Sequence, residues 1–175
     1  GFDAKYGDKM SSVLDIQYKK VNGFDASVSG SLLAASAYVG YGNENFSLTN
    51  AVRYKTTSNL LGTLDIKGEY KPVDFDYQTY LSWSISSRWG IDFIGNISRN
   101  NYDFIPSDRN TKFGTAEDVK EFKVYFDGQE KDYFHTYFGA FTISHKFNKF
   151  NNLSFNISAF ETRESETFDI SGEYW

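Results

Sequence analysis

The chain has no cysteine and only 2 prolines among its 175 residues. Without cysteine it can form neither a disulfide framework nor a thiolate metal site, and it has no cysteine nucleophile. It also shows little bias toward the helix-favouring residues alanine, leucine and glutamate, whereas aromatic residues make up 19% of the chain and glycine occurs 14 times. This composition is typical of strands and turns, and it predicts a nearly all-β protein.

The sequence also lacks an excess of basic residues and any long apolar run. The net charge is -5 and the pI is near 5.0, so no basic stripe is available to neutralise phosphates and we expect no nucleic-acid partner. No apolar run approaches the length of about 18 residues that a membrane helix needs, and Gly1–Met10 lacks the apolar region of a signal peptide. A transmembrane barrel would show no such run, because its lipid-facing residues occupy alternate positions.

Alternation is the strongest pattern in the chain. In Phe75–Ile85, FDYQTYLSWSI, apolar and aromatic residues occupy odd-numbered positions, and mainly polar residues occupy the even-numbered positions between them. Since a strand places alternate side chains on opposite faces, such a segment has an apolar face and a polar face. The same pattern recurs in Phe46–Tyr54, Trp89–Ser98, Thr136–Phe147 and Leu153–Ala159. In a soluble sandwich the apolar face would meet a protein core, whereas in an outer-membrane barrel it would meet lipid.

Under the barrel interpretation the two parities become a lipid-facing set and a lumen-lining set. The predicted lipid-facing residues are Leu81, Trp83, Ile91, Phe93, Phe141, Ile143, Phe155 and Ile157. The predicted lumen-lining residues are Gln78, Ser82, Asp92, Asn96, Asn156 and Ser158. From Phe75 to Ile85, at about 3.3 Å per residue and a tilt of about 40°, the chain covers roughly 25 Å, which matches the apolar band of such barrels.

Short turns and long connections alternate between these segments. The short turns are Gly42–Asn45, Ser86–Arg88 and Asn148–Asn152, and the longer connections are Thr56–Pro72, Pro106–Val119 and the stretch after Phe160. Short turns on one rim and long loops on the other are typical of an up-and-down outer-membrane barrel. Aromatic residues also gather near the ends, with Phe75 and Tyr77 toward the long loops and Trp83, Trp89 and Phe147 toward the short turns, as two interfacial girdles require.

The pattern predicts about seven membrane strands. These are Phe24–Tyr41, Phe46–Thr57, Pro72–Ser86, Trp89–Ile105, Lys131–Phe147, Leu153–Arg163 and Thr167–Trp175. Asp127-Gly128 predicts a tight hairpin turn, so Val119–Phe126 is expected to pair with the start of the fifth strand. Bacterial single-chain barrels use an even number of strands, so either Val13–Lys20 supplies an eighth strand or the chain is part of a larger barrel.

Several stretches resemble the TonB-dependent outer-membrane receptors at the junction of plug and barrel. Ala4–Lys20, AKYGDKMSSVLDIQYKK, is similar to the final plug pattern, in which an Ala-x-Tyr-Gly turn leads through small residues into a short apolar strand. Val52–Trp83 and Phe93–Pro106 resemble the first barrel strands and loops of a carboxypeptidase-regulatory-like subgroup. The resemblance assigns residues 1–20 to the end of a plug domain, expected to lie apart from the sheet, and residues 21–175 to the N-terminal part of a transmembrane β-barrel.

The resemblance implies a transporter in the outer membrane of a Gram-negative bacterium, with a plug inside a barrel of about 22 strands. This chain would form roughly the first third of that barrel and contact outer-membrane lipid. The transporter would import a scarce nutrient, which the long loops capture before the plug moves. TonB would act through a plug region absent from this sequence. The ligand class is left open among metal chelates, vitamins, peptides and glycans.

Two other functions remain open from the residues alone. A complete eight-stranded barrel could serve as an adhesin or membrane anchor, and the terminal aromatic Trp175 suits it. A soluble carbohydrate-binding sandwich would instead use exposed aromatic residues to stack on sugars. A small closed barrel must hydrogen-bond its first strand to its last, whereas a segment of a larger barrel must not.

The sequence gives no support for an enzyme or a metal site. His135 and His145 are the only histidines and lie ten residues apart, which is about 33 Å along an extended strand, so they cannot ligate one metal. No phosphate-binding loop and no nucleophile elbow is present. We therefore expect no catalytic residue, no metal and no cofactor.

Overall fold

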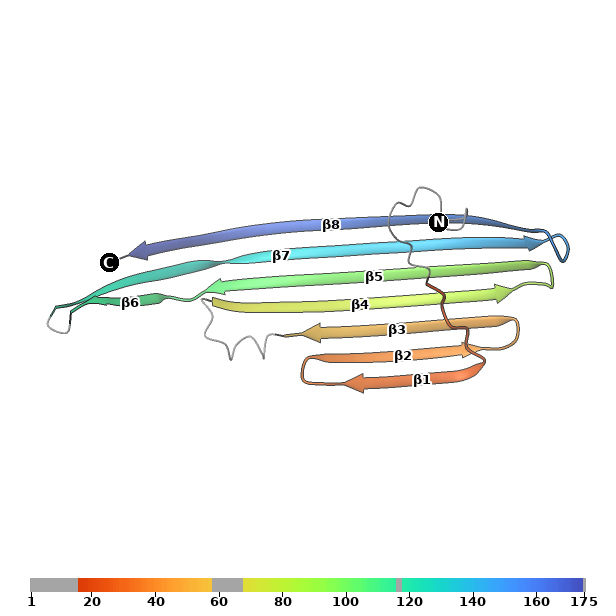
Figure 1. The fold of residues 1–175 in the computed structure, drawn as a ribbon, viewed down its shortest axis with the longest axis horizontal. Coiled ribbons are helices and arrows are strands. Elements are labelled where there is room, and N and C mark those ends of the chain that lie inside the picture. The colour runs from red at the N-terminus through yellow and green to blue at the C-terminus, as the bar shows by residue number, and fades with distance from the viewer. Residues whose placement is uncertain (1–15, 58–67, 116–117, 175) are drawn as a thin grey trace.

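The computed structural model describes residues 16–57, 68–115 and 118–174. Its strands are β1 (Gly23–Gly30), β2 (Ala34–Gly42), β3 (Phe46–Thr56), β4 (Gly68–Ser84), β5 (Trp89–Pro106), β6 (Arg109–Gly114), β7 (Val119–Lys146) and β8 (Asn152–Tyr174). They form one antiparallel sheet (Figure 1). This sheet curls into a half-barrel. The predicted all-β, antiparallel fold class is confirmed. Within the described ranges no helix has the length and apolar character needed to cross a membrane.

Strands that follow one another in the sequence mostly lie side by side in the sheet. The order is β1-β2-β3-β4-β5-β7, and both β6 and β8 also pair with β7. The first part of β7, Val119–Val124, pairs with β6, and its later part, from Glu130 on, pairs with β5. With 28 residues at about 3.3 Å each, β7 is far longer than an apolar band of about 25 Å, so its N-terminal part extends beyond such a band.

The two edges of the sheet do not meet. In the part of the chain that the structure describes, β1 pairs only with β2, and β8 pairs only with β7. Residues 16–20, the described part of the segment that the sequence offered as an eighth strand, are not a strand. This open geometry is the one expected for a segment of a larger barrel.

The predicted strand Phe24–Tyr41 is wrong, because it is a hairpin of β1 and β2. The chain reverses at residues 31–33, where Ser31 Oγ accepts hydrogen bonds from the backbone N–H groups of Leu33 at 3.3 Å and Ala34 at 3.0 Å. Serine favours turns because its hydroxyl bonds the backbone a few residues on. The opposite rim therefore also carries one tight turn, and the separation of short turns from long loops is not strict.

The predicted hairpin at Asp127-Gly128 is also wrong, since β7 runs through it without a break. Gly128 has a φ of 98°, and a Cβ at this position would lie 1.5 Å from the carbonyl oxygen of Asp169 on β8. The glycine is therefore required by the close approach of a neighbouring strand and not by a turn. Val119–Phe126 is continuous with the predicted fifth strand instead of pairing back onto it.

The predicted strands Leu153–Arg163 and Thr167–Trp175 are one strand, β8, which ends at Tyr174; Trp175 lies outside the described residues. The charged residues that separated them in the sequence, Glu164 and Glu166, pair with Phe134 and Asp132 of β7. Pro106–Val119, predicted as a loop, contains β6. Of Thr56–Pro72, also predicted as a loop, the residues Gly68–Pro72 belong to β4, while residues 58–67 lie outside the described residues. Pairing with a long neighbour has overridden local strand preference here.

The three predicted short turns are confirmed and lie together at one end of the sheet (Figure 1). A side chain within the turn stabilises each of them. Asn43 Oδ1 accepts from the N–H groups of Asn45 and Phe46 at 2.9 Å, and Ser86 Oγ accepts from the N–H of Trp89 at 3.1 Å. In the third turn Asn148 Oδ1 accepts from the N–H groups of Phe150 and Asn151 at 2.9 Å. These bonds satisfy backbone groups that the strand ladders leave free.

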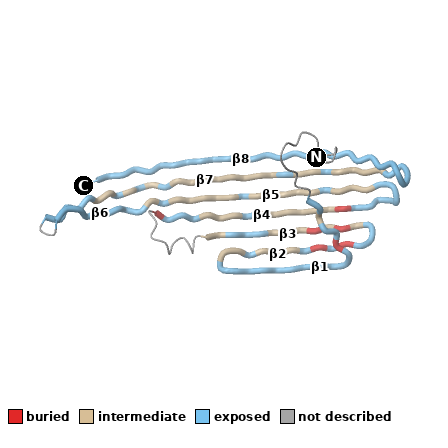
Figure 2. The backbone as a smooth tube through the Cα atoms, in the orientation of Figure 1, coloured by how far each residue is buried: buried red, intermediate tan, exposed pale blue. Residues whose placement is uncertain are grey.

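Burial is inverted relative to a soluble sandwich (Figure 2). Among the described residues the only buried apolar side chain is Val21, whereas the polar side chains of Ser47, Thr49 and Ser82 are buried. Large apolar residues such as Phe155 and Ile157 are 62% and 59% exposed. The described sheet therefore encloses no apolar core of its own.

Candidate functional site

The strand register places all the predicted lumen-lining residues on one side of the sheet, the polar face. Ser82 pairs with Asp92 and Gln78 with Asn96. Thr142, opposite Asp92, donates from Oγ1 to Asn156 Oδ1 at 2.6 Å. Ser158 follows on the same side of β8. That this face lines a lumen stays a prediction.

The predicted lipid-facing residues lie together on the opposite side, the apolar face. In one cross-strand row Leu81 pairs with Phe93, followed by Phe141 and Ile157, and in the next Trp83 pairs with Ile91, followed by Ile143 and Phe155. None of these side chains is buried. Their contact with lipid likewise stays a prediction.

The apolar face has a distinct boundary at each end. At the short turns, His145 lies between two aromatic rings, with centroids 4.1 Å from Trp89 and 4.5 Å from Phe147. At the other end the face becomes charged, where Arg99, His135 and Arg163 pair across β5, β7 and β8. The sequence placed Phe75 near a strand end, but it lies inside β4. The strand begins at Gly68, because its pairing with β5 continues past Phe75 as far as Gly68 and Pro106.

The described end of the N-terminal segment, residues 16–22, crosses the polar face (Figure 1). The Tyr18 ring lies 5.0 Å from that of Tyr80, and Gln78 Nε2 donates to Tyr18 Oη at 2.6 Å. The Val21 N–H donates to Ser47 Oγ at 2.8 Å. The expectation that Ala4–Lys20 lies apart from the sheet is therefore wrong for its described part, while residues 4–15 lie outside the described residues.

Two glycines of β2 make room for this segment. A Cβ on Gly42 would lie 2.1 Å from the carbonyl oxygen of Val21, and a Cβ on Gly40 would lie 2.9 Å from Val21 Cγ2. Both contacts are closer than real Cβ atoms allow, so the segment and β2 can approach this closely only with glycine. Val21 and Ser47 are buried as a result.

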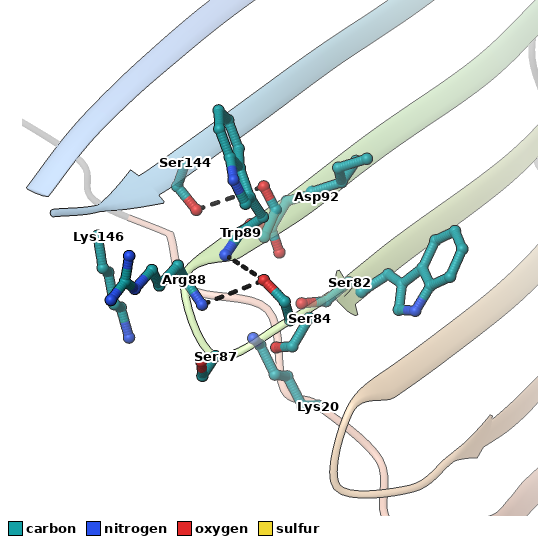
Figure 3. Close-up of a pocket in the computed structure, with 13 residues that line it drawn as sticks. Lys20, Ser82, Ser84, Ser87, Arg88, Trp89, Asp92, Ser144 and Lys146 are labelled. Carbon is teal, nitrogen blue, oxygen red and sulfur yellow. Dashed lines mark hydrogen bonds between the residues drawn. The ribbon is translucent and has the colours of Figure 1, made fainter.

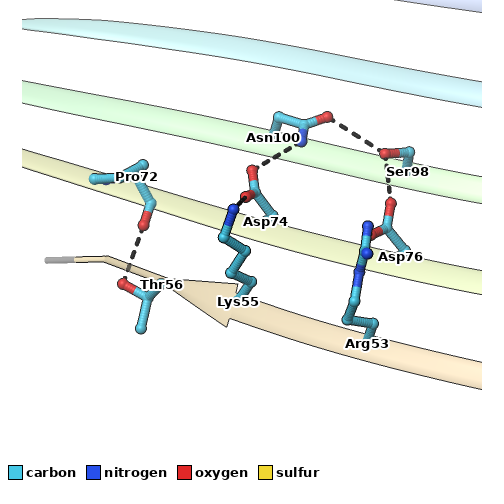
Figure 4. Close-up of polar contacts among 8 residues, drawn as sticks. All are labelled: Arg53, Lys55, Thr56, Pro72, Asp74, Asp76, Ser98 and Asn100. Atoms are coloured by element: carbon cyan, nitrogen blue, oxygen red, sulfur yellow. Dashed lines mark hydrogen bonds and ion pairs between the residues drawn. The ribbon is translucent and has the colours of Figure 1, made fainter. Parts of the chain in front are cut away.

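Toward the end of the sheet opposite the short turns, which we call the long-strand end, the polar face carries a ladder of charged and amide side chains (Figure 4). Arg53 Nε donates to Asp76 Oδ2 at 2.9 Å, and Ser98 Oγ donates to Asp76 Oδ1 at 2.8 Å. One step along, Asn100 Nδ2 donates to Asp74 Oδ1 at 2.8 Å, and the Lys55 ammonium lies 4.0 Å from Asp74. Opposite charges on neighbouring strands stabilise the register and make this surface polar.

We expect a double-mutant cycle of Arg53→Ala and Asp76→Ala to give a coupling of about 1 kcal/mol. That is the upper part of the range for exposed ion pairs, because Asp76 is only 23% exposed and Arg53 bonds it through two nitrogens. The free energy of unfolding of the wild type, both single variants and the double variant provides the measurement. A coupling near zero would contradict a stabilising role for the pair.

A cavity of about 140 Å³ lies on the polar face near the short turns (Figure 3). Lys20, Arg88 and Lys146 contribute positive charge to its lining, and Ser82 and Ser84 contribute hydroxyls. Ser144 Oγ, on its far side, donates to the Gly90 carbonyl at 3.4 Å. Asp92 contributes a carboxylate to the same lining, so the cavity suits a small polar group, and its described lining includes no histidine.

The described residues hold no group of three or more metal-ligating side chains. His135 and His145 are both on β7, one in the charged row and one among the aromatic rings. Alternation could have identified Asp76 and Tyr80, which share the parity of Gln78 and Ser82. It could not have identified Tyr18, whose contact with β4 is 60 residues distant in sequence.

Comparison of the chain with protein-family models, with curated proteins and with solved structures gave no match.

Proposed function

We propose that this chain is a segment of the transmembrane β-barrel of a TonB-dependent transporter, which imports a scarce nutrient across the outer membrane of a Gram-negative bacterium. One observation carries the proposal: a band of apolar residues, none of them buried, crosses β3, β4, β5, β7 and β8. The band is bounded by aromatic rings at the short turns and by the row of Arg99, His135 and Arg163. A contiguous apolar surface of this extent needs a cover, and lipid covers one whole face of a sheet.

The open edges support a barrel larger than the described sheet. Unpaired backbone groups on β1 and β8 would each cost several kcal/mol in hydrocarbon, so both edges need partner strands in a membrane. A closed barrel of eight strands would pair its first strand with its last, and β1 does not pair with β8. The geometry therefore favours the transporter over the small adhesin or anchor.

The N-terminal segment supports a plugged barrel. Residues 16–22 lie against the polar face through Tyr18 and Val21, as a chain entering a barrel wall from a plug in the lumen would do. The nutrient would pass along polar surfaces such as the ladder of Arg53, Asp74 and Asp76, and TonB would act on a plug region beyond this sequence. The proposal requires no catalytic group and no cofactor.

Cysteine labelling in cells tests this topology, because the chain has no cysteine of its own. Lys112→Cys on β6 is expected to react with a membrane-impermeant maleimide on intact cells, since β6 belongs to the long-strand end. Lys149→Cys, in the β7–β8 turn, is expected to react only after the outer membrane is permeabilised. Both side chains are exposed, so accessibility within the protein is matched.

Labelling of Lys149→Cys alone on intact cells would invert the topology. Equal labelling of both variants in a soluble fraction, without membrane association, would overturn the membrane proposal itself.

A further inference from the structure

A patch of aromatic rings and carboxylates lies on the polar face at its long-strand end. Strand pairing places Tyr102 of β5 beside Asp132 of β7, and Asp132 beside Glu166 of β8. In the adjacent row Phe134 of β7 pairs with Glu164 of β8. Each of these residues lies an even number of positions along its strand from a residue of the polar face described above, so all five side chains share that face.

The rings of this patch are packed against one another. The Tyr102 ring stacks on the Tyr70 ring with centroids 5.9 Å apart, and it meets the Phe134 ring edge-on, also at 5.9 Å. The face of an aromatic ring is negative and attracts cations. The rings and the neighbouring carboxylates therefore attract the same kind of ligand.

The carboxylates have no counter-charge within the described chain. Asp132 and Glu166 lie directly opposite each other on neighbouring strands, and like charges in this position destabilise a sheet. Neither of them, nor Glu164, makes an ion pair with another described residue. The basic side chains of the ladder on the same face are already paired with the aspartates of that ladder.

Two further observations show that the patch lacks positive charge. Asp132 Oδ1 is buried and accepts no hydrogen bond. Burial raises the pKa of the Tyr70 phenol, and neighbouring groups, Tyr102 and Asp132 among them, raise it further. A buried carboxylate oxygen without a donor is costly, so a positively charged donor added at this place would stabilise the patch.

We propose that the patch binds an organic cation, an ammonium or guanidinium group of the imported nutrient, between the Asp132 and Glu166 carboxylates and the Tyr102 ring. This inference rests on the proposed function and names the chemistry of its substrate, because a nutrient reaches this face only if the face lines the lumen. In that topology the long-strand end faces the cell exterior, where the nutrient arrives. Negative charge at an entrance also raises the local concentration of cations.

The chemistry of the patch favours an organic cation over a metal ion. A divalent cation such as calcium needs several converging oxygen ligands, and the described residues hold no group of three or more metal-ligating side chains. An ammonium or guanidinium group donates hydrogen bonds to carboxylates and also packs on ring faces. A free polyamine and a basic peptide both carry such groups.

The test is isothermal titration calorimetry of the full-length protein in phosphatidylcholine nanodiscs, with spermidine as the polyamine and trilysine as the basic peptide. The wild type is expected to bind at least one probe, and the tighter one identifies the carrier of the cation. Asp132→Asn and Glu166→Gln should each weaken the binding about fivefold, the upper part of the range for one exposed ion pair. Tyr102→Leu should weaken it about threefold through the loss of a ring face.

Two controls separate the patch from general negative charge. Glu173→Gln removes the same carboxylate from the same strand but on the opposite face, and it should leave the affinity at the wild-type value. Mg²⁺ at the concentration of the probe should not displace the probe. Without any probe, Glu166→Gln should be at least as stable to heat as the wild type, because it removes a repulsion.

Failure of the wild type to bind either probe would overturn the cation site. So would unchanged affinity in Asp132→Asn and Glu166→Gln, an equal loss in Glu173→Gln, or displacement of the probe by Mg²⁺. If Lys112→Cys is labelled on intact cells as expected but the protein binds no cation, this inference alone is refuted. A protein that is absent from the membrane refutes the proposed function.

Discussion

Replacing Ile157 by arginine is expected to destabilise the membrane-inserted protein by about 2 to 4 kcal/mol, whereas Ser158→Arg is expected to cost less than about 1 kcal/mol. The two residues are neighbours on β8, and both are exposed in the described sheet. Ile157 belongs to the row of Leu81, Phe93 and Phe141 in the apolar band, and Ser158 lies on the polar face. An arginine at Ile157 would have to enter hydrocarbon, while one at Ser158 would stay in water.

The comparison separates a membrane from a soluble protein because neither residue is in a protein core. In a soluble sheet both substitutions would be surface changes, within about 0.5 kcal/mol of the wild type. Folding of the full-length protein into lipid vesicles, titrated with urea, gives the free energies. Equal costs at both positions would contradict the lipid-facing assignment. Ser82→Arg is a poorer control than Ser158→Arg, because Ser82 is only 5% exposed and lines the cavity of about 140 Å³ together with Lys20.

The faces of the strands could be predicted from the sequence because they depend on a local rule. A period of two assigns each side chain to a face, so the sequence placed Leu81 and Ser82 on opposite sides and the structure has them there. The short turn at Asn43–Asn45 was equally local, since an asparagine side chain bonds the backbone of its own turn.

The strand ends could not be predicted in the same way, because pairing decides them. The local sequence around Glu164 and Glu166 predicts a loop, but both residues pair with β7 and are part of a continuous strand. The turn at Ser31 was hidden in a run of small residues that continues the alternation on both sides. The dipeptide Asp127-Gly128 is typical of a hairpin turn. Only the structure shows that the glycine is required by the close approach of the Asp169 backbone.

The candidate site shows the same division. Gln78 and Asn96 could be assigned to the polar face from parity, but the position of Tyr18 against Gln78 depends on a contact between distant segments. The role of Gly42 also became clear only from that contact, because the sequence shows it as one more turn glycine before Asn43.

Gly42→Ala is therefore expected to displace residues 16–22 from the polar face. The new Cβ would lie 2.1 Å from the carbonyl oxygen of Val21, 2.6 Å from that of Phe46 and 3.1 Å from the Ser47 Cα. All three are backbone atoms, so no side-chain rotation relieves the clash, and either the segment or the β2–β3 turn must move. Overpacking of this kind typically costs about 1 to 3 kcal/mol.

Hydrogen exchange of the Val21 amide reports the displacement directly, because that N–H donates to the buried Ser47 hydroxyl. Its exchange in the full-length protein is expected to accelerate by about tenfold or more in Gly42→Ala, since about 1.4 kcal/mol of lost protection is a factor of ten. Gly139→Ala is the matched control: it adds the same methyl group to a strand glycine with nothing within 4 Å, and Val21 exchange should stay at the wild-type rate. If Val21 remains protected in Gly42→Ala, the segment is not held by close approach to β2, and the plug-to-barrel contact loses its structural support.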